Sequence, residues 1–253
     1  MYSLKGILQS GFFILALSAG TLLAGEKAGV SFTRIGMLSV GGGMYTGQTF
    51  GDDLAAEGIP DASRYFGTFG FAGRTQVNRF ITSGELQAVM SRNRSSGGLT
   101  SDIGAGYGLF NAGFDLVASD AISLYPLLGM GGGVVSLQVR PEEQTFGQYL
   151  QNTAYAGSIH QGTFLLHAGA AFDAAVGRDR PRGPVWLGLR AGYIFDPRES
   201  DVWYQDRVKI TDGPRASLGG VYAKLTVGRE KRRYQTRERC GAMKGECETA
   251  KPE

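Results

Sequence analysis

The chain divides into eight segments of alternating polarity, and the connections between them alternate in length. The segments span about residues 34–46, 64–76, 79–92, 101–118, 121–139, 160–176, 184–196 and 214–228. The connections at 77–78, 119–120 and 177–183 are short, those at 47–63, 140–159 and 197–213 are long, and 93–100 is intermediate. This rhythm is typical of an all-β, up-and-down antiparallel barrel whose longer loops gather at one end. A soluble sandwich has no reason to alternate its loop lengths so regularly.

Most of the segments have one apolar wall and one mixed polar wall. In residues 160–176 Phe164, Leu166 and Phe172 fall on one side, opposite His167 and Asp173. Because successive side chains on a strand point to opposite faces, this pattern predicts strands that are apolar on one face only. The fifth segment is apolar on both faces, and its glycines at 131–133, like those at 41–43, predict bulges or tight bends. Residues 82–85 are an alternative position for the turn between the second and third strands.

Two kinds of barrel are compatible with strands that have one apolar and one polar face. One is a membrane barrel with its apolar wall outside, and the other is a soluble carrier barrel with that wall inside. The polar walls carry too few charges for a water-exposed surface, which favours the membrane arrangement. The mean hydropathy of −0.12 excludes a helical multi-span protein. It suits a transmembrane barrel, in which only every second residue faces lipid.

The N-terminus has the features of a secretion signal. Lys5 provides the positive region, residues 11–23 form the apolar region, and cleavage is expected after Ala24. The alternative is a retained anchor helix. No later apolar run reaches about 18 residues, and lipid admits only helices and closed barrels. The expected organisation is a signal peptide at 1–24, a periplasmic segment at 25–33, the barrel at 34–228 and a basic periplasmic tail at 229–253.

The signal, the eight alternating segments and the short and long connections resemble the OmpA/OmpX-like superfamily of small outer-membrane barrels. The resemblance covers about residues 30–228. It implies an eight-stranded barrel with short periplasmic turns and longer extracellular loops, integral to the outer membrane of a Gram-negative-type bacterium. It is architectural, so it carries no functional residues across. The apolar and aromatic residues of 219–227 partly match the assembly signal of such families, although the chain continues beyond them.

Charged residues on the polar walls are candidates for the interior of the barrel. They are Arg74, Glu85, Asp115, Asp173, Arg190 and Lys224. Since a stranded buried charge costs several kcal/mol, these acids and bases are expected to pair with one another. The alternative is an ion path through the lumen.

Sites for catalysis and cofactors are weakly indicated. Ser158, His160 and Glu142 could form a nucleophile, base and acid at the outer rim, as in a lipid-modifying enzyme. The glycine runs at 104–108 and 129–133 lack the following helix and the lysine of a phosphate-binding loop, and are interpreted as strand glycines. We therefore expect no cofactor, no metal site and no nucleic-acid partner.

The segment from residue 229 departs in composition from the rest of the chain. Residues 229–239 carry six basic and two acidic side chains, which suits contact with anionic lipid or cell-wall polymer; a solvated, disordered end is the alternative. Cys240 and Cys247 are the only cysteines, and export favours a disulfide between them.

The sequence predicts a monomeric outer-membrane barrel with a non-enzymatic structural or surface-interaction role, surrounded by outer-membrane lipid. Its contact surfaces are expected in the long loops, among them an acidic one with Asp52 and Asp53 and another with Trp203 and Tyr204. A lipid-modifying enzyme and a narrow channel for small solutes are the alternatives.

Overall fold

A computed structural model describes residues 32–46, 49–56, 58–59, 63–91, 94–96, 98–117, 119, 121–141, 157–177, 183–198, 200–205 and 208–231. The signal peptide, the segment up to residue 31, Glu142 and the residues after 231, including Cys240 and Cys247, lie outside the described residues.

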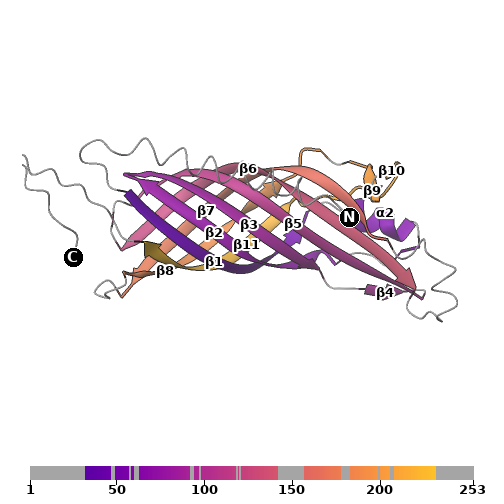
Figure 1. The fold of residues 1–253 in the computed structure, drawn as a ribbon, viewed down its shortest axis with the longest axis horizontal. Coiled ribbons are helices and arrows are strands. Elements are labelled where there is room, and N and C mark those ends of the chain that lie inside the picture. Colours follow the sequence, from indigo (N-terminus) through magenta and orange to yellow (C-terminus); the bar gives the residue numbers. More distant parts are fainter. Residues whose placement is uncertain are drawn as a thin grey trace, which may run out of the picture.

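Eight long antiparallel strands form a closed ring (Figure 1). They are β1 (Phe32–Tyr45), β2 (Tyr65–Val77), β3 (Phe80–Ser91), β5 (Leu99–Phe114), β6 (Ile122–Pro141), β7 (Ile159–Val176), β8 (Val185–Phe195) and β11 (Gly220–Lys231). Each strand pairs with the next, and β11 pairs with β1 to close the barrel. The predicted eight-stranded up-and-down barrel is confirmed.

The two ends of the barrel differ. One end carries the shorter connections: a two-residue turn at 78–79, residues 115–121 and residues 177–184. Asn78 takes the left-handed conformation in the tight turn, with φ of 55°, which asparagine tolerates. The other end carries the helix α2 (Thr49–Ala56) and the short strands β4 (Arg94–Ser96), β9 (Trp203–Gln205) and β10 (Val208–Ile210) (Figure 1). The short-turn end faces the periplasm, and the long-loop end faces the exterior.

The apolar wall of the strands faces outward. Leu38, Phe71, Leu86 and Leu189 are between 50% and 64% exposed, while the residues next to them in sequence point inward and are mostly buried. Exposed aromatic residues lie toward both ends, for example the cross-strand pair Phe80 and Phe114 near the short turns. This is the surface that lipid requires, and it rules out the soluble carrier arrangement. No helix among the described residues is long and apolar enough to cross a membrane.

Three details differ from the sequence-based expectations. The strand pairing continues without interruption through residues 41–43 and 129–133, so the predicted bulges are wrong. Residues 82–85 pair with residues 72–75 inside β3, so the alternative turn there is also wrong. β11 continues to Lys231, because Arg229, Glu230 and Lys231 pair with the start of β1. The first three residues of the segment expected to be a tail therefore belong to the barrel.

The outward wall generates the first prediction. Leu189→Arg places a cation on the lipid-facing side of β8, where Leu189 is 50% exposed. We expect folding into bilayers to be weakened by about 2–4 kcal/mol, the cost of arginine near the membrane midplane. Urea titration of folding into lipid vesicles measures it, with Leu189→Phe as the apolar control. Equal stability of the arginine variant and the wild type would mean that β8 does not face lipid at this position.

Candidate functional site

A buried ion pair spans the middle of the lumen. Lys224 of β11 donates to the Glu85 carboxylate of β3, and both side chains are about 1% exposed. β1 and β2 separate these two strands in the ring, so the contact crosses the interior of the barrel rather than linking neighbours. Asn111 Nδ2 donates to the other Glu85 oxygen at 3.0 Å. The carboxylate therefore has a partner on each oxygen, which a buried charge requires.

A chain of neutral polar groups continues from this ion pair. His167 Nδ1 lies 2.6 Å from Asn111 Oδ1, and His167 Nε2 lies 2.6 Å from the Tyr222 hydroxyl. Because Asn111 uses its amide nitrogen on Glu85, its oxygen is left to accept from Nδ1–H of the histidine. In the neutral imidazole Nε2 is then an acceptor, and Tyr222 donates to it. Four strands are joined in this way: β3, β5, β7 and β11.

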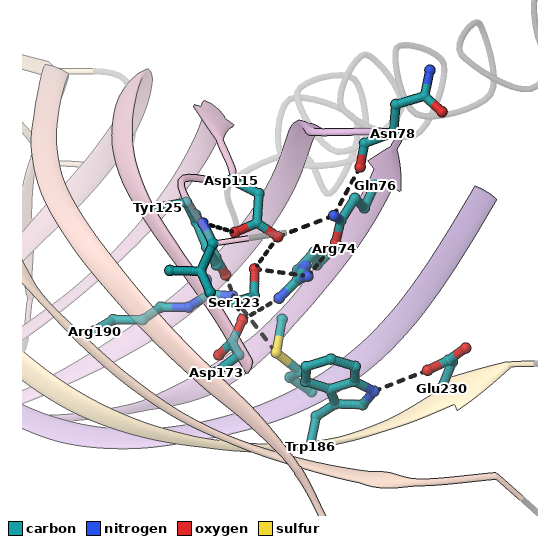
Figure 2. A network of polar contacts seen from close by, with 12 residues as sticks. Arg74, Gln76, Asn78, Asp115, Ser123, Tyr125, Asp173, Trp186, Arg190 and Glu230 are labelled. Atoms are coloured by element: carbon teal, nitrogen blue, oxygen red, sulfur yellow. Dashed lines mark hydrogen bonds and ion pairs between the residues drawn. The ribbon is translucent and has the colours of Figure 1, made fainter. Parts of the chain in front are cut away.

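A second polar network lies nearer the short-turn end (Figure 2). Arg74 Nη1 donates to Asp173 Oδ2 at 2.5 Å, and the Tyr125 hydroxyl donates to the same oxygen at 2.6 Å. Ser123 accepts from Arg74 Nη2 at 3.3 Å and donates to Asp115 at 2.8 Å. The network therefore joins β2 and β7 to the start of β6 and to the connection that follows β5. Asp115 itself lies just beyond the end of β5.

Arg190 is the remaining charged side chain of the predicted interior set. It is completely buried, and Nη2 lies 3.6 Å from the sulfur of Met37. Its Nε and Nη1 have no hydrogen-bond partner among the described residues. The structure thus places all six predicted residues in buried positions and joins five of them into two networks, while Arg190 makes no direct ion pair within the described part of the chain.

Inward-facing glycines make room for these side chains. An ideal Cβ at Gly188 would clash with Asp173 Oδ1 and with Thr226 Oγ1. A Cβ at Gly129 would clash with Asn111 Oδ1. An eight-stranded barrel has an interior only wide enough for side chains. Large polar residues on some strands therefore need glycine on the strands beside them.

An apolar cluster fills the lumen toward the long-loop end. Its strand members come from most of the ring: Phe66, Val89, Tyr107, Leu109, Val135, Leu137, Leu165, Ile194 and Tyr222. Leu54 of α2, Trp203 of β9, Ala216 and Leu218 complete it from the loops. The first and last long loops therefore share a hydrophobic core with the barrel mouth.

Further contacts tie these two loops together into a cap, defined by α2, β9, β10 and residues 211–219. The Phe50 and Trp203 rings stack at 6.2 Å, and Trp203 Nε1 donates to the Pro214 carbonyl at 2.7 Å. The Arg215 backbone N–H donates to Asp53 Oδ2 at 3.0 Å. Trp203, predicted with Tyr204 to belong to a contact surface, is fully buried in the cap, whereas Tyr204 is 43% exposed.

Two residues of the alternative catalytic trio lie at the start of β7. Ser158 Oγ is 2.9 Å from His160 Nε2, a distance compatible with a nucleophile and its base. The third member, Glu142, is outside the described residues. Within the described part of the chain no cluster of three His, Cys, Asp or Glu side chains could hold a metal ion.

The neutral members of the networks were not among the residues predicted from the sequence. Asn111, Tyr125, Ser123 and Tyr222 are all 5% exposed or less. Strand alternation alone predicts that these side chains point inward, because each lies an even number of residues from another inward-facing residue of its strand. Their partners lie on distant segments, and strand phase carries no information about them.

Comparisons with known proteins give no family. No family model matches the chain, and no curated protein matches its sequence. The crystal structure of Ail, the attachment invasion locus protein of Yersinia pestis, is similar at 16% identity and a TM-score of 0.39, over 81% of this chain and 100% of that one. Ail in complex with the heparin analogue sucrose octasulfate gives 16% identity, a TM-score of 0.38 and the same coverage.

A further solved structure also resembles the chain. A major outer membrane protein from Thermus thermophilus is 10% identical with a TM-score of 0.46, over 78% of this chain and 99% of that one. The closed ring, the apolar exterior and the charged lumen, taken on their own, define an integral outer-membrane β-barrel.

The cross-lumen ion pair generates the second prediction. Lys224→Met leaves the Glu85 carboxylate buried without its counter-charge, and we expect a loss of about 3–5 kcal/mol in the free energy of unfolding. Adding Glu85→Gln should recover part of that loss, because no stranded charge remains. Denaturant unfolding in detergent micelles measures both, with the exposed Lys209→Gln as the control. A single variant as stable as the wild type would contradict the pairing.

The glycine spacing generates the third prediction. Gly188→Ala forces a methyl group against Asp173 and Thr226, and we expect a loss of about 1–3 kcal/mol from overpacking. Gly162→Ala is the matched control, since its Cβ position meets nothing within 4 Å. Unfolding midpoints of the two variants under the same conditions test the difference. Equal midpoints would show that the interior has spare room at Gly188.

Proposed function

We propose that this barrel is a non-enzymatic surface-interaction protein whose contact surface is the cap. The observation that supports this role is the shared apolar core of the two loops, in which Leu54 and Trp203 are completely buried. Loops that served only to connect strands would not need such a core. A packed cap holds its outer residues in fixed positions, which lowers the entropy that a binding partner must overcome.

The filled lumen supports an interaction role over a channel. The two polar networks occupy the middle and the short-turn half of the interior, and the apolar cluster lies above them. A solute path would need to separate buried ion pairs, which is energetically costly. Conductance steps from the purified full chain in planar bilayers would favour the channel instead.

The pair formed by Ser158 and His160 is the observation that favours the second candidate, a lipid-modifying enzyme. Fatty-acid release from phospholipid vesicles by the full chain tests it. Release that Ser158→Ala abolishes would assign catalysis to this pair and displace the non-enzymatic role. Release that does not exceed that of a heat-denatured sample would remove the candidate.

We also propose roles for the two terminal segments that lie outside the described residues. Residues 1–24 act as a cleaved export signal in a Gram-negative-type bacterium. The tail from residue 232 lies in the periplasm, where Cys240 and Cys247 form a disulfide. The barrel is a monomer, and the basic residues of the tail contact anionic lipid or cell-wall polymer. N-terminal sequencing and thiol labelling with and without reductant test the first two claims.

The cap generates the fourth prediction. Tyr204 and Val208 are 43% and 65% exposed on β9 and β10, outside the shared core. We expect bacteria that display the full chain to be retained by at least one member of a panel of immobilised glycans and proteins. The combined Tyr204→Ala and Val208→Asp changes should weaken that retention roughly tenfold or more, as expected for loss of an aromatic anchor.

The matched control is Arg79→Ala, an exposed change in the tight turn at the opposite end of the barrel. Heat-modifiable gel mobility confirms that each variant forms the barrel. Retention that is equal for the cap variant and the control would show that the contact surface is not the cap. Absence of retention over the whole panel, with the barrel correctly displayed, would favour a purely structural role.

A further inference from the structure

A shallow apolar groove lies on the lipid-facing surface, in the half of the barrel nearer the short-turn end. It has a volume of about 520 Å³ and is formed by β1, β2, β8 and β11. Its walls are Leu38, Phe71 and Val227, which are 60%, 64% and 52% exposed. Leu38 pairs with both Phe71 and Val227, so these three side chains form one row across the strands. Gly36 lies two residues from this row, nearer the start of β1, with open space in front of its Cβ position. The groove is therefore a gap in the outer layer of side chains.

The gap extends across the neighbouring strand. Gly36 pairs with Gly73 of β2, whose outward side also meets nothing within 4 Å. Two glycines opposite each other leave the backbone of both strands uncovered on the lipid side. A hydrocarbon chain can cover such a surface because it needs no hydrogen bonds, whereas a hydrated glycan would lose its own hydration there.

Basic residues stand at the short-turn side of this groove. Arg229 of β11 is exposed, pairs with Gly36 and is part of the groove lining. Arg34 lies two residues nearer the start of β1, in the same outward phase as Gly36 and Leu38. Long arginine side chains near a membrane surface keep their stems in the apolar layer and their charged ends at the headgroups.

We propose that this groove binds an anionic phospholipid of the periplasmic leaflet. One acyl chain lies over Gly36 and Gly73 and against the row formed by Leu38, Phe71 and Val227, and the headgroup phosphate meets Arg229 and Arg34. Guanidinium groups form strong charge-assisted hydrogen bonds with phosphate oxygens. The site is at the opposite end of the barrel from the cap and does not depend on the surface-interaction role.

The test uses native mass spectrometry of the purified full chain in detergent. The protein is mixed with equal amounts of phosphatidylglycerol and phosphatidylcholine that carry the same acyl chains. We expect the phosphatidylglycerol adduct to be retained preferentially as the collision energy is raised. Arg229→Gln should reduce that preference roughly fivefold, since one basic residue near a lipid surface contributes about 1 kcal/mol. Lys209→Gln, on the extracellular hairpin, should leave it unchanged.

Filling the groove separates chain binding from headgroup binding. Gly36→Leu should remove the retained adduct of both lipids, whereas Gly162→Leu, at an equally open outward position on β7, should not. Glycerol phosphate without acyl chains should give no retained adduct, because the groove supplies the apolar part of the site. If Gly36→Leu does not show heat-modifiable mobility, Gly36→Ala serves in its place with a smaller expected effect. Equal retention of the two lipids by the wild type, or adducts unaffected by filling the groove, would overturn the proposal.

Discussion

Closure of the sheet between β1 and β11 is the constraint on which the rest of the structure depends. Lipid offers no hydrogen-bond partners to the backbone, so every strand edge in the membrane must be paired. The first strand pairs with the last over twelve residues, from Arg34 with Lys231 to Tyr45 with Gly220. Once eight strands close, the interior is only as wide as the side chains that fill it. The polar networks, the inward glycines and the apolar cluster are all consequences of that width.

The two polar networks and the largest apolar cluster lie at different levels along the barrel axis, and two smaller apolar clusters, which include Trp186 and Tyr125, lie beside the network around Arg74. The network around Arg74 and Asp173 is nearest the short turns, the one around Glu85 and Lys224 is central, and the apolar cluster is uppermost. A buried charge needs partners held at fixed positions, and the rigid strands provide them for both oxygens of Glu85. Apolar side chains suit the long-loop end of the lumen, because loop residues can pack against them without having to meet the geometry of a hydrogen bond. The cap formed by the first and last long loops therefore rests on hydrophobic contacts, with polar contacts such as Asp53 with Arg215 at its edge.

The two sites proposed on the outside of the barrel differ in what forms their surface. The cap offers side chains held by a packed core, while the lipid groove consists of missing side chains, Gly36 and Gly73, beside a basic rim. Glycine thus has two roles in this barrel. On the inward face, as at Gly188, it gives space to a neighbouring polar group. On the outward face it leaves a recess that an acyl chain can occupy.

The sequence by itself determined the strands, their order and their two faces. Alternation is a property of residues adjacent in the chain, so the inward phase of Asp173 and the outward phase of Leu189 could be predicted without knowing any partner. The partners were decided only by the tertiary structure. Glu85 and Lys224 are 139 residues apart and meet because the strands tilt and close at one particular register. Trp203 became the core of the cap for the same reason: its burial depends on α2 and on residues 214–218 coming together above the barrel mouth, and no local pattern encodes that meeting.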